Sequence, residues 1–158
     1  EFVSSTLGGS QNVVLDNEVS GVNFDFGALG DADVLTLFDG TNNIIVSDIQ
    51  TVNGGTGNDT IVVGSTVLQT LSLGLGTDSV VATGVANFNV TALASVENFL
   101  GSGGTDNVGL ASSLTSGSVY DGGAGFNTLT LFTGSSNSAS ITNFTNIFGG
   151  ASSEFLNF

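Results

Sequence analysis

Leu35-Thr36-Leu37-Phe38 occurs a second time as Leu129-Thr130-Leu131-Phe132, 94 residues further along the 158-residue chain. Both copies alternate large apolar residues with a hydroxyl residue, which is the period-two pattern of a β-strand with one buried face. A match at half this distance is also present, since Asn12, Asp59 and Asp106 lie 47 residues apart and each starts a short run that ends in Val or Ile. A recurrence at a fixed long period predicts a repeat architecture.

The recurrence divides the chain into three units of about 47 residues, at 12–58, 59–105 and 106–152, with partial units at both ends. The turn motifs split each unit into stretches of about 20 and 27 residues, which predicts two coils per unit. Short strands between Gly, Asn, Asp and Ser turns favour an all-β fold, a β-roll-like β-solenoid that occupies residues 1–158 as a single segment. An antiparallel sandwich also has short strands, but it does not account for matched phases over 94 residues.

The repeat also predicts which side chains stack in the core. Phe26, Leu73 and Tyr120 lie 47 residues apart and share the phase of the repeat. If each unit adds two whole coils, these three side chains fall on one line along the axis, and we expect them to form a core ladder. The first and last residues of the chain fall within units, so we also expect the array either to continue covalently or to associate end to end.

The charge balance excludes several classes of partner. The chain contains 14 Asp and Glu residues and no Lys, Arg or His, giving a net charge of −14. No side-chain salt bridge can form, so the negative charge must be neutralised from solvent, and a hard divalent cation is the natural candidate. Nucleic acid and anionic membrane surfaces are disfavoured for the same reason. Cys is absent, which excludes disulfides and thiolate metal sites, and no apolar run is long enough to insert into a membrane.

The most specific motif is Gly54-Gly55-Thr56-Gly57-Asn58-Asp59-Thr60-Ile61-Val62, which matches the nonapeptide G-G-x-G-x-D-x-U-x. By this motif the chain resembles the RTX (repeats-in-toxin) family of secreted bacterial proteins. Weaker copies of the motif are Leu73–Val80, Gly101–Val108 and Gly122–Leu129. Family repeats follow one another without a gap, nonapeptide after nonapeptide, whereas these turns are separated by strands that lack the motif. The resemblance therefore covers the turns and not the strands between them.

The resemblance implies calcium as the cofactor, bound by turn carbonyls and Asp carboxylates of adjacent coils. The implied ligands are Gly54, Thr56, Asp59, Asp78 and Asp106. Calcium prefers six to eight oxygen ligands, which carboxylates and the carbonyls of Gly-rich turns can supply.

Three further turn residues are candidates for the same role. Asp31 and Asp33 can clamp a second ion, and Asn127 occupies the Asp position of the last copy. A plain tight turn remains the alternative reading of each Gly-Asp turn, above all at Asp33 and Asn127.

The residue inventory argues against an enzyme. Without His, Cys or Lys the chain has no ordinary general base near neutral pH and no activated nucleophile. A two-carboxylate glycosidase needs two acids that flank a groove, and no pair of acids is marked out for that role.

The sequence therefore favours a calcium-binding structural protein, secreted by a bacterium and located outside the cell or on its surface. We expect copies to polymerise, end to end or in a lattice, as an extracellular filament, a biofilm matrix or a surface layer; a cell-surface polysaccharide is a further candidate partner. The alternative is the calcium-stiffened stalk of a cell-adhesion protein. A third reading, an ice-binding face, needs repeated Thr-x-Thr elements, of which Thr128-x-Thr130 is one.

Overall fold

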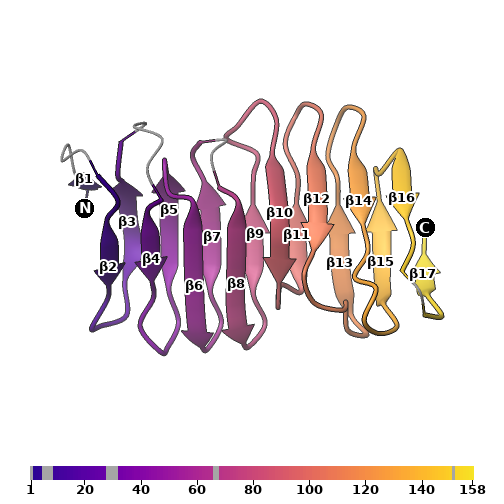
Figure 1. Cartoon of the computed structure of the whole chain (residues 1–158), viewed down its shortest axis with the longest axis horizontal. Coiled ribbons are helices and arrows are strands. Elements are labelled where there is room, and N and C mark those ends of the chain that lie inside the picture. The colour runs from indigo at the N-terminus through magenta and orange to yellow at the C-terminus, as the bar shows by residue number, and fades with distance from the viewer. Residues whose placement is uncertain (1, 5–8, 28–31, 66–67, 151) are drawn as a thin grey trace.

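The chain winds into a solenoid in which two parallel sheets face each other (Figure 1). The computed structural model describes residues 2–4, 9–27, 32–65, 68–150 and 152–158. Strands with odd numbers form one sheet and strands with even numbers form the other, so that successive strands alternate between the sheets. We call these the odd sheet and the even sheet.

The nine strands of the odd sheet are β1 (Phe2–Ser4), β3 (Ser20–Asp25), β5 (Asn43–Ser47), β7 (Thr60–Val63), β9 (Ser79–Val81), β11 (Asn98–Leu100), β13 (Ser118–Asp121), β15 (Ser138–Thr142) and β17 (Phe155–Asn157). The eight strands of the even sheet are β2 (Asn12–Val14), β4 (Val34–Thr36), β6 (Thr51–Thr56), β8 (Thr70–Leu75), β10 (Asn89–Ala94), β12 (Asn107–Leu110), β14 (Thr128–Thr130) and β16 (Asn146–Phe148).

Each strand pairs in parallel with the strand two places further along the chain, which makes one coil of the solenoid. Coil length varies, because Ile44 pairs with Ile61 after a short coil, whereas Val13 pairs with Leu35 after a longer one. No helix is present among the described residues, and none of them forms a helix long and apolar enough to cross a membrane. The prediction of an all-β solenoid is therefore confirmed.

The register corrects the relation between the 47-residue period and the coil. Leu35 on β4 and Leu129 on β14 lie in the same sheet and are separated by five coils, so 94 residues span five coils and 47 residues span two and a half. A shift of 47 residues therefore moves a residue to the opposite sheet. The expected ladder of Phe26, Leu73 and Tyr120 is wrong for this reason, because Tyr120 lies on the odd sheet and Leu73 on the even sheet.

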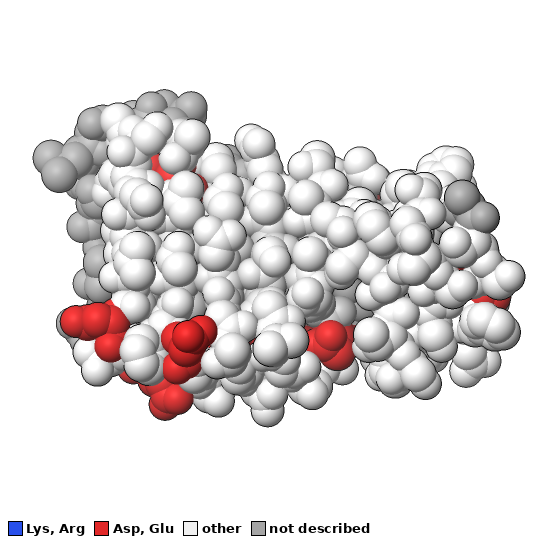
Figure 2. Space-filling view, turned by 60° about the horizontal axis from the view of Figure 1, so that its bottom comes forward, with Lys and Arg blue, Asp and Glu red and all other residues white. Residues whose placement is uncertain are grey.

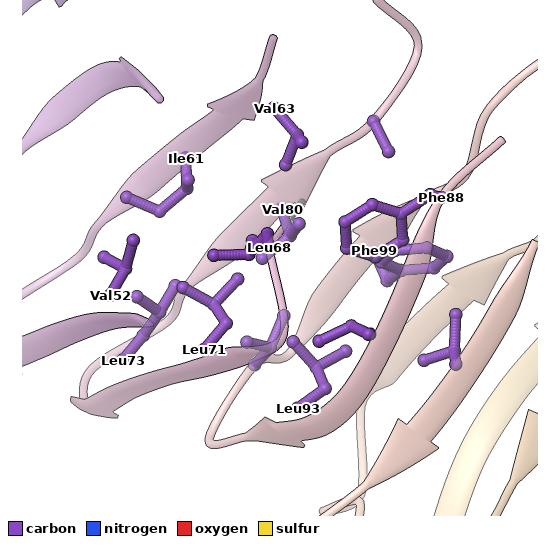
Figure 3. Packing of buried hydrophobic residues seen from close by; sticks show 14 of the residues in the cluster. Val52, Ile61, Val63, Leu68, Leu71, Leu73, Val80, Phe88, Leu93 and Phe99 are labelled. Carbon is purple, nitrogen blue, oxygen red and sulfur yellow. The ribbon is translucent and has the colours of Figure 1, made fainter. Parts of the chain in front are cut away.

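The core lies between the two sheets and consists of the inward-facing residues of β3 to β15 together with apolar residues of the turns. In the central coils Val52, Leu71 and Leu93 align across the even sheet (Figure 3). Ile61, Val80 and Phe99 align across the odd sheet and meet them in the core. These side chains are at most 3% exposed. Burial of this apolar surface contributes roughly 25 cal/mol of stabilising free energy per Å² and is the main force that stabilises the coils.

Aromatic residues close the core toward the C-terminal half. The Phe99 and Tyr120 rings stack with centroids 5.6 Å apart, and Phe88 lies 5.6 Å from Phe99. The buried Tyr120 hydroxyl donates to the Val96 carbonyl at 2.9 Å, so its polar end is satisfied.

Candidate metal centre at the turns

The turns form two rows along the solenoid, one at each edge of the two facing sheets. The turns that lead from even strands into odd strands lie along the bottom in Figure 1, and we call this row the odd corner. The turns that lead into even strands form the even corner. Figure 2 turns the bottom of the molecule toward the viewer and shows carboxylates gathered toward the N-terminal end, with large uncharged areas elsewhere on that face.

A column of polar side chains fills the odd corner, one for each coil that contributes, immediately before an odd strand. Its members, which we call the odd column, are Asn42, Asp59, Asp78, Glu97, Asn137 and Glu154. The backbone N–H of one member donates to the side-chain oxygen of the next. Asn42 N bonds Asp59 Oδ1 at 2.9 Å, Asp59 N bonds Asp78 Oδ1 at 2.7 Å, and Asp78 N bonds Glu97 Oε2 at 2.8 Å.

The tips of the same turns are joined in the reverse sense. Here the side chain of one coil accepts a hydrogen bond from an N–H of the following coil. Thr56 N donates to Asp39 Oδ1 at 3.1 Å, and Thr77 N donates to Asn58 Oδ1 at 2.8 Å. Backbone donors that no strand ladder can use are thus satisfied by side chains of neighbouring coils. Asp39 is exposed, and its side chain accepts the Thr56 N–H.

The even corner holds a similar, more interrupted column. Gln11 N donates to Asp33 Oδ1 at 2.8 Å, and Asp33 N donates to Gln50 Oε1 at 2.7 Å. Further along, Asp106 N donates to Asn127 Oδ1 at 2.9 Å. In both of these pairs the acid is followed by an amide in the next coil, so the even corner places no two acids in succession along these bonds.

The buried carboxylates differ in how completely they are hydrogen-bonded. Asp106 is fully buried, and both of its oxygens have donors: Oδ1 accepts from Phe88 N at 2.7 Å and from the Ser102 hydroxyl, and Oδ2 accepts from Ser102 N at 2.6 Å. Asp59 and Asp78 are equally buried, yet the Oδ2 atom of each has no hydrogen-bond partner. A buried carboxylate oxygen without a donor is costly, so these two positions call for a proton or a cation.

The electrostatics of the odd column agree with this contrast. Burial raises the pKa of Asp59, and hydrogen bonds from Asn42 and the nearby backbone N–H of Gly55 offset part of the effect. The pKa of Asp78 is raised to about 6, first by burial and also by the neighbouring carboxylates of Asp59 and Glu97, while the hydrogen bond from Asp59 N partly offsets them. Burial and two neighbouring acids, in a chain without bases, thus make ionisation of the middle acid harder than in the unfolded chain.

The residues proposed as ligands from the sequence fall into two groups. Gly54 and Thr56 lie on β6, which leads into the odd corner where Asp59 and Asp78 sit one coil apart. Asp33, Asp106 and Asn127 lie at the even corner, away from this group. The Asn127 amide nitrogen lies within hydrogen-bond distance of four carbonyl oxygens, those of Gly122, Gly123, Ala124 and Asn143, among which it shares its two hydrogens. Asp31 lies outside the described residues.

Sequence reasoning missed Glu97, the third acid of the odd column. No glycine-rich turn precedes Glu97. Instead, Ser95 adopts a positive φ of 54° and makes the turn two residues before it. A signal was nevertheless present. Asp59-Thr-Ile, Asp78-Ser-Val and Glu97-Asn-Phe recur at equal intervals along the chain, each an acid followed by a polar and then a core residue.

The odd column fits a calcium ion in part. Two buried carboxylate oxygens without donors, one coil apart, are the hard anionic ligands that calcium prefers. Among the described residues, however, no three Asp, Glu, His or Cys side chains converge as a group able to hold a metal ion. Any ion bound here would need backbone carbonyls and water to complete its six to eight ligands.

Comparison of the chain with protein-family models, with curated proteins and with solved structures gives no match.

Proposed function

We propose that this solenoid is a calcium-dependent structural protein of the bacterial cell exterior, in which copies associate into a fibre, a matrix or a surface layer. Calcium would be held at the odd corner by Asp59 and Asp78. The backbone carbonyl oxygens of Gly54 and Thr56, at the end of β6, are candidate further ligands. The ion would supply the positive charge that the sequence lacks, and the side chains would link two successive coils through it.

The observation that carries the proposal is the pair of buried, unpartnered oxygens on Asp59 and Asp78. Glu154 in the odd column also leaves one oxygen without a donor, but elsewhere one acceptor oxygen per coil is enough, because Asn42, Asn127 and Asn137 fill the same role with neutral amides. A carboxylate at these two positions therefore adds charge that the turn does not need. Selection of a cation accounts for that extra charge.

The proposal is non-catalytic. A sequence without His, Cys, Lys or Arg offers no imidazole, thiol or amine for catalysis and no cationic group to bind phosphate. A net charge of −14 suits a rod that stays dispersed until divalent cations screen it, and calcium at millimolar concentration is a condition of the cell exterior rather than of the cytosol.

Calcium titration into chelated protein tests the proposal. We expect a cooperative gain of β signal in circular dichroism, followed by assemblies visible by electron microscopy. A full β signal in excess chelator would contradict the calcium dependence. Folded single rods that remain monomeric at millimolar calcium would contradict assembly and favour the adhesin stalk instead.

A further inference from the structure

The outer face of the odd sheet carries a straight line of aliphatic side chains. Ile45, Val62, Val81 and Leu100 lie on β5, β7, β9 and β11, and the strand register places each directly beside the next. Their neighbours in sequence point into the core, so these four point outward. Ile45 is 38% exposed and Leu100 is 39% exposed. We call these four residues the aliphatic stripe.

A shallow hollow lies beside the stripe toward the C-terminal end. It has a volume of about 240 Å³ and lies over β9, β11 and β13, where Val81, Leu100 and Val119 contribute to its lining together with Asp121, which pairs with Leu100. Val119 is 48% exposed and pairs with Asn98 in the register of the odd sheet. Contiguous apolar surface on a sheet face, with a depression that can receive an apolar side chain, is typical of an interaction site.

Charge decides which kind of partner this face can accept. The other outward residues of the four strands are neutral, namely Asn43, Ser47, Thr60, Ser79 and Asn98. The next acids on the sheet flank the stripe, Asp25 on β3 and Asp121 on β13. A basic partner would be drawn to the acidic corners instead. In a chain of net charge −14, the part of the face over β5, β7, β9 and β11 has no outward carboxylate, so a second copy meets less repulsion there than at the acidic corners; Asp121 stands beside Leu100 at one end.

The geometry also suits a second copy. The stripe is straight and repeats at the strand spacing of about 4.8 Å, so an identical stripe turned by a two-fold axis matches it along its length. Two sheets that pack face to face interdigitate apolar side chains at a separation of about 10 Å. We propose that two copies of the chain pair side by side through the aliphatic stripes of their odd sheets. The inference rests on the proposed function in one respect: the pairing would be the lateral contact between copies in the proposed assembly.

Sedimentation velocity of the 158-residue chain at millimolar calcium tests the pairing. We expect the dissociation constant of the pair to rise at least tenfold in Leu100→Asp, which places a charge in the stripe. Asn107→Asp is the matched control, because Asn107 is exposed on the even sheet and its replacement adds the same charge to the other face. We expect the control to pair within about twofold of wild type. Circular dichroism verifies the fold of each variant.

Val62→Thr keeps the test decisive if Leu100→Asp fails to fold, because Thr has nearly the same shape and a similar preference for strands. We expect it to weaken pairing severalfold. Equal pairing of wild type and the folded stripe variants overturns the inference but leaves the calcium-dependent assembly intact. Equal pairing with and without chelator supports the inference and contradicts the calcium dependence. A wild type that stays monomeric under all conditions overturns both.

Discussion

Replacing Asp78 by Asn separates the structural role of this carboxylate from its proposed role as a ligand. Asp78 uses one oxygen to accept the Asp59 N–H at 2.7 Å, and its second oxygen has no partner. An amide keeps the first interaction, as the side chain of Asn42 does when it accepts from Val19 N in the same column. The Asn42 amide nitrogen donates to the carbonyls of Phe38 and Gly40, which precede it in the same turn. An amide introduced at Asp78 would find the corresponding carbonyls in its own turn.

The expected magnitude follows from the spacing of the coils. Carboxylates one coil apart, at the strand spacing of about 4.8 Å, repel by about 3 kcal/mol at an effective dielectric constant of about 20. Asp78 has such a neighbour on each side, Asp59 and Glu97, which sets the upper range of the effect. Allowing for solvent screening, we expect Asp78→Asn to raise the free energy of unfolding by about 1–3 kcal/mol in chelator at pH 7.5.

In calcium the order of stability should reverse. Wild type gains about 4.1 kcal/mol when free calcium is about 1,000 times the dissociation constant, which exceeds the difference expected in chelator, whereas the variant has lost a ligand and gains less. Urea unfolding followed by circular dichroism measures both conditions; where wild type lacks β structure in chelator, the β signal itself is compared. Asp39→Asn is the control, because it removes an exposed acid and keeps the oxygen that accepts Thr56 N. A variant that is less stable than wild type in chelator refutes the reasoning.

Three further predictions concern pH, ligand identity and turn packing. In chelator the folded state binds a proton at Asp78 more tightly than the unfolded chain does, because the pKa of Asp78 is raised from 3.8 to about 6 on folding. The stabilisation from this proton is complete below pH 3.8 and is lost as the pH rises through 6. The urea midpoint should therefore be higher at about pH 5 than at about pH 7.5. An equal or lower midpoint at pH 5 would contradict it. Asp59→Ala should shift the midpoint of the calcium titration more than Asp39→Ala, and equal midpoints would argue against the assignment. Gly76→Ala should lower the free energy of unfolding in urea by more than about 2 kcal/mol, because Gly76 has a φ of 147° and an added Cβ would overlap a backbone carbonyl of the preceding coil. The control Gly103→Ala, with open space at its Cβ, should lower it by less than about 1 kcal/mol.

The sequence predicted the fold class because strand patterning is a local signal and the 94-residue recurrence can be read directly from the sequence. It did not predict the phase of the coils. Because 94 residues span five coils, a shift of 47 residues spans two and a half coils and joins positions on opposite sheets. Coils also differ in length, as the pairings of Ile44 with Ile61 and of Val13 with Leu35 show. Only the hydrogen-bonded register shows that Leu35 and Leu129 are five coils apart.

The candidate site could be found only in part for the same reason. The motif around Asp59 is visible in the sequence, but the contact between Asp59 N and Asp78 Oδ1 depends on the register of two coils. The structure also shows what distinguishes Asp106, which has the same turn motif. Ser102 and Phe88 satisfy both of its oxygens, whereas Asp78 has one oxygen without a donor. Motif and spacing do not separate these two situations, because the difference lies in contacts between residues that share no pattern.

The distribution of acids along the two columns gives the proposed calcium dependence a definite place in the solenoid. At the even corner Asp33 and Asp106 are each followed by an amide in the next coil, so those turns are joined without consecutive charges. At the odd corner three acids follow one another, directly before β7, β9 and β11. The same three strands carry Val62, Val81 and Leu100 of the aliphatic stripe on their outer face. A cation that fixes these coils would therefore also fix the spacing of the stripe, so that calcium binding and lateral pairing favour each other through the same three strands.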